Sequence, residues 1–256
     1  MEKYEEFKAS ILKMTKIDLS SYKENQMRRR LESLARKHEC PDFLDYVKLL
    51  QKDKDAFNEF INFMTINVSE FYRNPEQWKL LSNYVEEMIQ RKGKHLKIWS
   101  AACSTGDEPY SLVMALSKFI PVNEIHILAT DLDNTVISKA KIGLYNEKSI
   151  TNVPDEFKKK YFSKVGESYQ ISEEIKRQVE FKQHNLLLDK YPNDCDLIVC
   201  RNVLIYFTEE AKHEIYVKFK NSLVSGGILF IGSTEQVIDY KDIGYIRKSS
   251  FFYQNP

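Results

Sequence analysis

One stretch of the sequence has the residue types of a ligand-binding turn. After the apolar run 96–99, small residues lead to Gly106, and Glu108 and Pro109 open a helical pattern. Small residues let a ligand lie close to the backbone, and the free N–H groups of a helix start attract anionic groups. The single glycine does not make the GxGxxG turn of a pyrophosphate site, which disfavours NAD and FAD. Alone, the stretch fits either a cofactor site or an ordinary strand-to-helix turn.

A second polar group follows the next apolar run, 125–129. Asp131 stands about 20 residues beyond the first turn, where an acidic side chain can accept both hydroxyls of a ribose. A helix N-cap is the competing interpretation, and Asp133 or Asn134 can fill that role instead. Ligands of open α/β sheets bind at the carboxyl ends of the strands, so both polar groups are expected at one edge.

Three further strings carry polar side chains next to apolar runs. His184, Asn185 and Leu186 follow the third predicted strand, and Arg201 and Asn202 follow the fourth, with Tyr206 shortly after. Residues 67–74 mix hydroxyl, amide, guanidinium and aromatic groups just before the α/β region. Each string taken alone also fits capping or core packing, since buried polar groups normally have partners.

The elements that must position these residues fall into two kinds. Apolar residues recur at helical spacing up to about residue 70, which predicts a small helical bundle, and Ser21 with Glu24 is a candidate capping box for its second helix. From residue 94, short apolar runs alternate with helical patterns, which predicts a parallel sheet. We therefore predict a helical domain at 1–73, a linker helix at 74–93 and an α/β domain at 94–256. An inserted small β-subdomain is expected at about 155–178, with a hairpin around Gly166.

Composition excludes several classes of protein. The chain has 256 residues, 43% hydrophobic and 29% charged, with a net charge of +1, which is ordinary for a globular protein and gives no general support for nucleic-acid binding. No apolar run is long enough for a membrane span, and the start lacks the apolar stretch of a signal peptide, so we expect a cytoplasmic protein. The four cysteines are scattered, so we expect reduced thiols and no metal site.

Together the strings resemble the chemotaxis receptor methyltransferases, the CheR family. The motifs that carry the resemblance run in family order and cover nearly the whole chain, at 67–73, 102–111, 129–133, 184–187 and 200–207. The resemblance implies a class I S-adenosylmethionine methyltransferase, with a Rossmann-like sheet, a small all-helical N-terminal domain and the β-subdomain insertion. It also implies methyl transfer from S-adenosylmethionine to glutamate side chains of chemoreceptors, giving γ-methyl esters and S-adenosylhomocysteine.

The resemblance assigns roles position by position. Glu108 would hold the ammonium at the methionine end of the cofactor, Asp131 the ribose, and Tyr206 would lie beside the transferred methyl. Arg73 and Tyr206 are predicted to orient the substrate carboxylate. The other expected cofactor contacts are Asn67, Ser69 and Arg73 from the helical side, Asn185 and Leu186 beside the adenine, and Arg201 and Asn202 along the far wall.

A receptor helix that displays glutamates should meet a basic surface. The second predicted helix carries five basic residues, Arg28, Arg29, Arg30, Arg36 and Lys37. Arg29 and Arg36 are seven residues apart and so share a face of the helix, as do Arg30 and Lys37. A solvated polar face is the competing interpretation. The expected partner is the cytoplasmic helical domain of a membrane chemoreceptor, and the protein is expected to bind it as a monomer without inserting into the membrane.

Family members that bind a receptor C-terminal pentapeptide carry a longer, glycine-bearing loop in the β-subdomain. Here the hairpin looks short, so we expect independence from such a tether.

Three other functions compete with this interpretation. A nicotinamide dehydrogenase is disfavoured by the missing GxGxxG turn. A nonenzymatic adaptor with a vestigial cleft is disfavoured by the joint presence of Glu108, Asp131 and Arg73. The third is a methyltransferase for nucleic acid or small molecules, of which the near-neutral net charge and the basic helix disfavour nucleic acid.

Overall fold

The computed structural model describes residues 1–65 and 68–256 and divides into two units. The first comprises Met1–Asn67 with Leu204–Glu214, and the second comprises Val68–Val203 with Ile215–Pro256. Asn67, a predicted cofactor contact, lies outside the described residues. The division differs from the predicted boundary at 73 because the segment after residue 68 packs with the sheet, and because Leu204–Glu214 returns to the helices.

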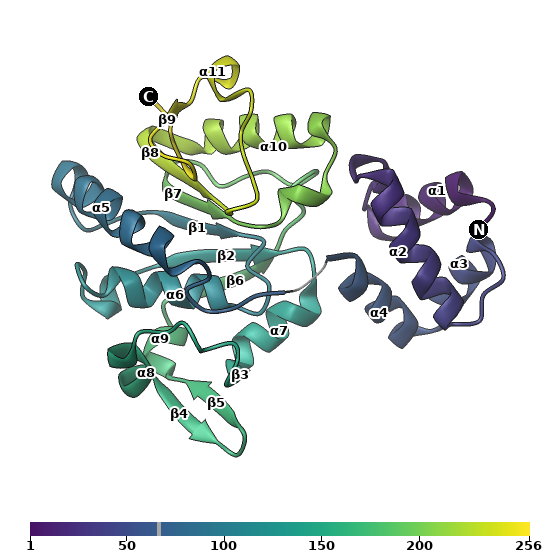
Figure 1. Ribbon diagram of the computed structural model, residues 1–256, viewed down its shortest axis with the longest axis horizontal. Coiled ribbons are helices and arrows are strands. Elements are labelled where there is room, and N and C mark those ends of the chain that lie inside the picture. The colour runs from purple at the N-terminus through teal and green to yellow at the C-terminus, as the bar shows by residue number, and fades with distance from the viewer. Residues whose placement is uncertain (66–67) are drawn as a thin grey trace. The chain divides into compact units, whose positions relative to one another are not determined.

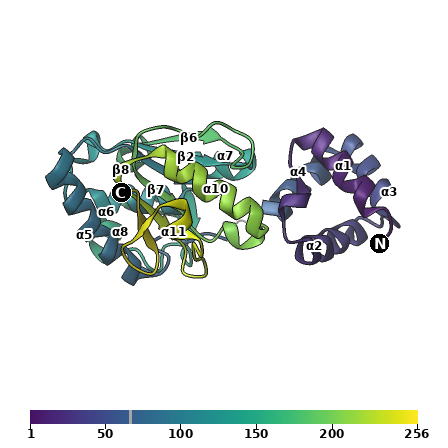
Figure 2. The ribbon, with the colours of Figure 1, turned by 90° about the horizontal axis from the view of Figure 1, so that it is seen from above.

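The first unit is a cluster of helices (Figure 2), and buried aromatic residues form its core. The ring centroids of Phe7 and Phe43 lie 4.6 Å apart with the rings tilted, and Tyr46 and Phe60 complete the group, all fully buried. These residues recur at helical spacing, so each helix turns one apolar stripe inward. The elements are α1 (Tyr4–Thr15), η1 (Leu19–Ser21), α2 (Glu24–Lys37), α3 (Phe43–Lys52) and α4 (Lys54–Thr65).

The predicted capping box at Ser21 is wrong. The N-cap of α2 is Lys23, without a side-chain cap, and Ser21 ends the 3₁₀ turn η1. Asp18 caps that turn, and Tyr22 forms a β-bridge with Phe207 from the returning segment. These contacts fix the chain before α2, so Ser21 is not next to the first turn of the helix.

The second unit contains a seven-stranded sheet in the order β6-β2-β1-β7-β8-β10-β9 (Figure 1). The five strands from β6 to β8 pair in parallel, and β10 is antiparallel to both β8 and β9. The prediction of a parallel sheet with late antiparallel strands is confirmed. The strands are β1 (Ile98–Ala101), β2 (Ile127–Asp131), β6 (Val179–Gln183), β7 (Cys195–Cys200), β8 (Leu223–Ile231), β9 (Ile246–Arg247) and β10 (Phe252–Gln254).

Helices flank this sheet and connect its strands. The helix α5 is tied to β7 by an ion pair between Lys92 and the fully buried Asp196, at 2.8 Å. The carboxylate of Asp196 also accepts the backbone N–H of Lys97, just before β1. The helices are α5 (Pro75–Lys92), α6 (Asp107–Leu116), α7 (Asn134–Ile142), α10 (Glu209–Ser222) and α11 (Tyr240–Ile243), with the 3₁₀ turn η2 (Val122–Glu124). The 3₁₀ turn η3 (Leu204–Tyr206) and the first residues of α10 belong to the first unit.

A small three-stranded sheet projects beyond α6 and α7 (Figure 1). Its order is β3-β5-β4, all antiparallel, and the predicted hairpin is present, with Val165 paired to Ser168 around a two-residue loop. The insertion starts earlier than predicted, because β3 already belongs to it. Its elements are β3 (Leu144–Asn146), α8 (Asp155–Tyr161), β4 (Phe162–Val165), β5 (Ser168–Ile171) and α9 (Glu173–Lys176).

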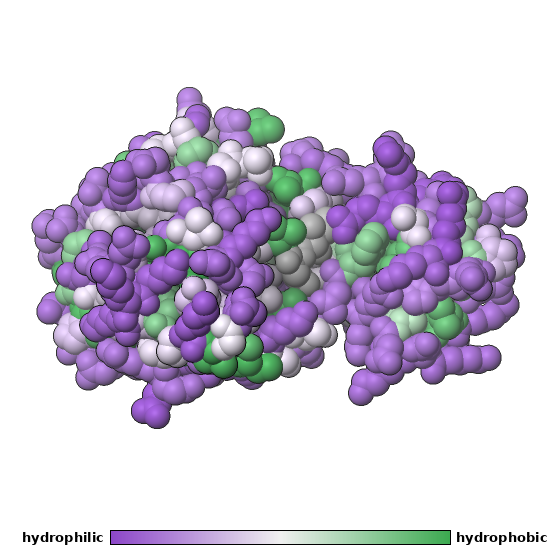
Figure 3. Space-filling view, turned by 60° about the horizontal axis from the view of Figure 1, so that its bottom comes forward, coloured by the Kyte–Doolittle hydropathy of each residue, from purple (hydrophilic) through white to green (hydrophobic). Residues whose placement is uncertain are grey.

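Hydrophilic residues cover most of the face shown in Figure 3, and the apolar patches on it are small and separate. Among the described residues, no helix is both long and apolar enough to cross a membrane. The same residues contain no group of three or more His, Cys, Asp or Glu arranged to hold a metal ion.

Candidate functional site

The turn between β1 and α6 has an unusual backbone. Ala102, Ser104 and Gly106 all have positive φ, at 62°, 48° and 89°. Such values in non-glycine residues cost free energy and concentrate at functional sites, where the surrounding structure enforces them. Tyr145 from the small sheet donates its hydroxyl to the carbonyl of Thr105 at 2.7 Å, which helps to hold the turn.

Gly106 is required at its position for two reasons. Its φ of 89° is strained for any residue with a side chain, and a Cβ there would lie 2.9 Å from the Cβ of Ala140 and 3.0 Å from the ring of Tyr110. The helix α6 starts directly after it, at Asp107, two residues earlier than the predicted Pro109. The turn therefore brings two carboxylates, Asp107 and Glu108, to the first turn of this helix.

Glu108 lies at the carboxyl end of β1. Its Oε1 accepts the hydroxyl of Ser100 at 2.8 Å, and its Oε2 lies 3.9 Å from Nη1 of Arg201. Burial raises the pKa of Glu108 to about 7, although Arg201, Ser100 and Arg73 favour the charged form. A carboxylate that is this desolvated is well placed to gain from a cationic ligand group.

The structure separates the roles of the two aspartates after β2. Asp133 caps α7, because its side chain accepts the N–H of Thr135 at 2.7 Å. Asp131 ends the strand, is buried, and accepts the N–H groups of Ser104 and Asp133 at 2.8 and 3.0 Å. Burial raises the pKa of Asp131 to about 6. The carboxylate of Asp131 thus ties the turn after β1 to the end of β2, where the ribose was predicted.

Asp107 is a buried carboxylate that the motif analysis did not select. Its Oδ2 accepts the hydroxyl of Thr105, and the Ser69 side chain acts as a further hydrogen-bond donor to the carboxyl group. Its Oδ1 has no partner among the described residues, and burial raises the pKa. Ser69, a predicted cofactor contact, therefore lies at the start of α6.

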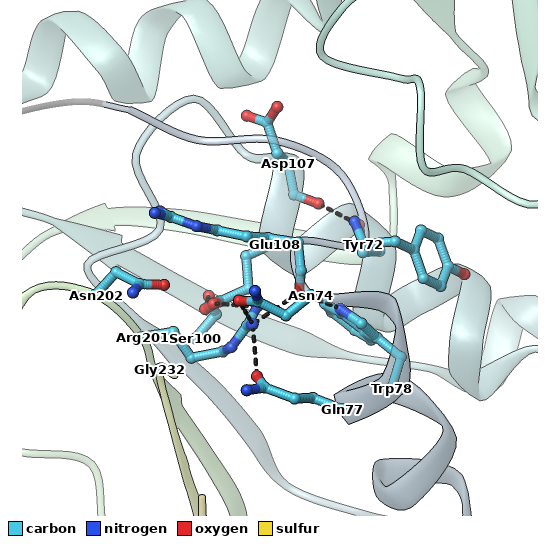
Figure 4. A network of polar contacts seen from close by, with 12 residues as sticks. Tyr72, Asn74, Gln77, Trp78, Ser100, Asp107, Glu108, Arg201, Asn202 and Gly232 are labelled. Atoms are coloured by element: carbon cyan, nitrogen blue, oxygen red, sulfur yellow. Dashed lines mark hydrogen bonds and ion pairs between the residues drawn. The ribbon is translucent and has the colours of Figure 1, made fainter. Parts of the chain in front are cut away.

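Arg201 is a buried bridge between the end of β7 and the segment before α5 (Figure 4). Its Nη2 donates to the carbonyl of Arg73 at 2.7 Å, to Oδ1 of Asn74 at 3.2 Å and to Oε1 of Gln77 at 2.8 Å. Its guanidinium also lies 4.7 Å from the ring of Phe230. Nη2 of Arg201 thus holds residues 73–77 at the site, whereas its Nε has no partner among the described residues, so its expected place along the far wall of the cofactor site stays a prediction.

Arg73 lies close to Glu108, as expected. Its guanidinium lowers the pKa of Glu108 and that of Arg201, and its Nη1 donates to the carbonyl of Val68 at 3.3 Å. Tyr72 and Asn74, on either side, both have positive φ. Arg73 therefore sits in a constrained segment beside the predicted cofactor carboxylate.

Asn185 and Leu186 follow β6 at the same edge. The backbone N–H of His184 donates to the carbonyl of Asp131 at 2.9 Å, which places the string beside the end of β2. The Asn185 side chain accepts the N–H of Leu187 at 2.9 Å, and Leu186 is buried. The strand ends thus bring together His184–Leu186, Asp131, Glu108 and Asn202, as the topology predicted.

Tyr206 and the predicted docking residues belong to the helical unit. The carbonyl of Tyr206 accepts the N–H of Lys23 at 2.9 Å, and its side chain lies near enough to Arg30 to affect the pKa of that arginine. The proposed role of Tyr206 at the transferred methyl remains a prediction.

Comparison with known proteins identifies the family. Residues 67–251 match the model of the CheR methyltransferase, SAM binding domain, and residues 2–65 match that of the CheR methyltransferase, all-alpha domain. A chemotaxis protein methyltransferase of Listeria innocua is 42% identical over 93% of this chain and 91% of its own. Relatives of the same name from Borreliella burgdorferi and Escherichia coli are both 32% identical, over 92% and 82% of this chain and 88% and 74% of theirs.

The chain belongs to the CheR methyltransferase family. It is a chemotaxis methyltransferase with the class I fold, and its cofactor is S-adenosylmethionine. The strand-end residues fit this cofactor, since they include two buried carboxylates for a cation and a ribose. They also include polar atoms without partners among the described residues, such as Oδ1 of Asn202 and Oγ of Ser104. Buried polar atoms of this kind are expected where a ligand completes the hydrogen bonding.

Several polar residues near these strand ends received no role from the sequence motifs, although Asp107 and Asn74 lie within the stretches 102–111 and 67–74. Asp107, Asn74 and Gln77 give no periodic or spacing signal, since each is polar in a helical or turn context. Glu235 is buried and binds three backbone N–H groups. A signal for it did exist: it follows Gly232 at the end of a strand, the same small-then-acidic pattern that marked Glu108.

Proposed function

We propose that this CheR-family enzyme methylates glutamate side chains on the cytoplasmic helical domains of chemoreceptors, forming γ-methyl esters. The observation that carries the proposal is a basic hollow on the helical unit that includes a half-buried arginine. The hollow has a volume of about 580 Å³ and is lined by Asn25, Gln26, Arg29, Arg30, Ser33 and Phe63. A hollow with two guanidinium groups and no acidic lining residue suits a carboxylate better than an amine.

Arg30 supplies the specific chemistry of this hollow. Its Nη2 donates to the carbonyl of Phe63, and its guanidinium lies 4.8 Å from that ring. Its Nε has no partner within the described chain, and burial lowers the pKa of Arg30. A carboxylate would satisfy the free donor, because guanidinium groups bind carboxylates through paired N–H bonds. Tyr206, near Arg30, would present its hydroxyl to the same substrate group.

The other predicted docking residues are already paired. Arg28 and Arg36 lie 3.2 and 3.8 Å from the carboxylate of Glu32, and Lys37 pairs with Glu59. Exposed pairs of this kind can still add to a positive field, but they offer fewer free donors. Arg29 is exposed and makes no ion pair with any described residue, so the docking proposal now centres on Arg29 and Arg30.

The chemistry of the acceptor requires little acid–base catalysis. A glutamate side chain has an ordinary pKa of about 4.3 and is ionised at neutral pH. The cofactor, held by Glu108 and Asp131, would supply a methyl group on a sulfonium for transfer to the carboxylate oxygen, with S-adenosylhomocysteine as the leaving group. This step consumes two opposite charges, so excluding water and aligning the reactants favour it. Arg73 and Tyr206 are each proposed to orient the substrate carboxylate, as the family motifs suggest.

The strand-end geometry supports the cofactor-binding roles that the family motifs suggest. Glu108 would bind the methionine ammonium and Asp131 the ribose, while Ser69, Asn185, Leu186 and Asn202 would complete the site. Arg201 would act by holding residues 73–77, given its bonds to that segment. The proposed contact of Asn67 with the cofactor rests on the family motif alone.

We further propose that methylation does not depend on a receptor tail. The β4–β5 hairpin closes through the two residues Gly166 and Glu167, with no longer glycine-bearing loop. The proposed enzyme acts as a cytoplasmic monomer. Removing the receptor C-terminus should leave the rate unchanged, and a large loss would contradict this part of the proposal.

Transfer of labelled methyl from S-adenosylmethionine to receptor-bearing membranes tests the substrate. The labelled product should release its label in mild base, as an ester does, and a base-stable product would overturn the proposal. A nonenzymatic adaptor would give no labelling at all. Arg73→Ala should abolish most transfer even at saturating S-adenosylmethionine and should also weaken cofactor binding, and full activity with native cofactor binding would remove both proposed roles.

The docking surface can be tested separately. Arg29→Ala should raise the KM for the receptor and reduce its salt dependence, because surface steering is screened by ions. The matched control is Lys13→Ala, an exposed cation on another helix. Equal effects of the two substitutions would show that only net charge matters.

A further inference from the structure

Glu235 forms a clamp at the carboxyl ends of β7 and β8. It lies four residues after the end of β8 and is 7% exposed. Its Oε2 accepts the N–H groups of Asn202 and Gly232, each at 2.7 Å, and its Oε1 accepts the N–H of Val203 at 2.9 Å. One carboxylate therefore fixes backbone from two neighbouring strand ends.

The clamp holds Asn202 in a conformation that the chain would otherwise seldom adopt. Its φ is 60°, in the left-handed region, which costs free energy even for asparagine. Gly232 makes the close approach possible, since a Cβ there would lie 2.6 Å from the Asn202 nitrogen and 2.8 Å from its Cγ. Figure 4 shows Asn202 and Gly232 next to each other beside Arg201.

The side chain of Asn202 is thereby left with one free acceptor. Its Nδ2 donates to Oγ1 of Thr234 at 3.2 Å, which sets the amide orientation. Its Oδ1 is buried and has no partner in the described part of the chain. A buried carbonyl oxygen without a donor is costly, so a ligand N–H or O–H would complete it.

We infer that Glu235 is a positioning residue for cofactor binding: it holds Asn202 so that Oδ1 faces a donor group of S-adenosylmethionine. The inference rests on the proposed place of Asn202 in the cofactor site. Only glutamate meets the geometry. Glutamine would turn an NH₂ group toward at least one backbone N–H, and aspartate is one methylene too short to reach both strand ends.

Loss of the clamp should act on cofactor affinity more than on turnover. Without it, Asn202 populates the binding conformation for only part of the time, and the apparent Kd rises by the reciprocal of that populated fraction. Once the cofactor is bound at saturation, its own contacts restore the conformation, so kcat changes little. A residue with only a structural role would lower thermal stability and leave the Kd of the folded protein unchanged.

The test compares full-length Glu235→Gln with the matched control Glu174→Gln, an exposed glutamate on α9. Calorimetric titration with S-adenosylhomocysteine well below the thermal midpoint should show a Kd raised about tenfold or more in Glu235→Gln only. The KM for S-adenosylmethionine should rise in parallel, with kcat within about twofold. If Glu235→Gln does not fold, Glu235→Asp takes its place and should show the same split.

Asn202→Ala separates this inference from the proposed function. Weaker binding in Asn202→Ala with native binding in Glu235→Gln would overturn the inference and keep Asn202 in the site. Native binding in Asn202→Ala would overturn both the proposed place of Asn202 in the cofactor site and the positioning role of Glu235. A fall in kcat at unchanged Kd in Glu235→Gln would place Glu235 in the transfer step and also overturn the positioning role.

Discussion

The affinity for S-adenosylmethionine should show a bell-shaped dependence on pH, governed by Glu108. Burial raises the pKa of this carboxyl group to about 7, so protonation removes its negative charge within the neutral range. The proposed ligand of Glu108 is an α-ammonium group, whose ordinary pKa is about 7.8. Binding requires the carboxylate and the ammonium together, so affinity falls as the pH drops below 7 and also as it rises above 8.

The size of the effect follows from the two ionised fractions. At pH 7.4 about 70% of each group is in the required form, whereas at pH 6 only about 9% of Glu108 is ionised. Allowing for the fuller protonation of the ammonium at pH 6, the affinity should be about sixfold lower than at pH 7.4. At pH 9 the ammonium is about 6% protonated, which lowers the affinity by about ninefold.

Calorimetric titration with S-adenosylmethionine itself from pH 5.5 to 9, in the absence of receptor, measures the fall in affinity on both sides of neutral pH. Glu108→Gln should bind about 10- to 100-fold more weakly near neutral pH, because it loses a charge-assisted hydrogen bond, and its fall in affinity below pH 7 should disappear. Asp131→Asn should still lose cofactor affinity as the pH falls below 7, since that loss is assigned to Glu108 and the pKa of Asp131 is about 6. A flat profile from pH 7.4 to 6 in the folded native protein would refute the assignment of Glu108.

Three further predictions concern stability and docking. Gly106→Ala should lower the free energy of unfolding by about 1–3 kcal/mol in urea titrations, because of its positive φ and its contacts below 3 Å, whereas Gly166→Ala, with open space around it, should cost about 1 kcal/mol or less. Asp196→Ala should cost about 1–3 kcal/mol by the same measurement, since it frees a buried backbone N–H and leaves Lys92, 43% exposed, to return to water. Arg29→Ala should raise the receptor KM about 2- to 5-fold at low salt, and by less at high salt, with unchanged cofactor affinity in the calorimeter.

Much of the fold was predictable because apolar periodicity reports which side of an element is buried. The five parallel strands, the late antiparallel strands and the hairpin at Gly166 were all expected from short apolar runs and turn residues. The capping box at Ser21 failed, since a tertiary contact between Tyr22 and Phe207 fixed the chain there instead. The segment Leu204–Glu214 also joined the helical unit, a long-range pairing that no local pattern reports.

The sequence by itself determined the types of residue at the strand ends and, through the alternation of strands and helices, that these ends meet at one edge. Glu108, Asp131 and Asn202 follow from that reasoning, because parallel strands joined by right-handed crossovers place their carboxyl ends together. Only the tertiary structure decided which polar group binds which partner. It made Asp133 the cap and left Asp131 at the strand end, turned Arg201 into a buried bridge, and revealed Glu235 as the clamp on Asn202. The physical reason is that burial and hydrogen-bond partners depend on residues distant in sequence, whereas periodicity depends only on near neighbours.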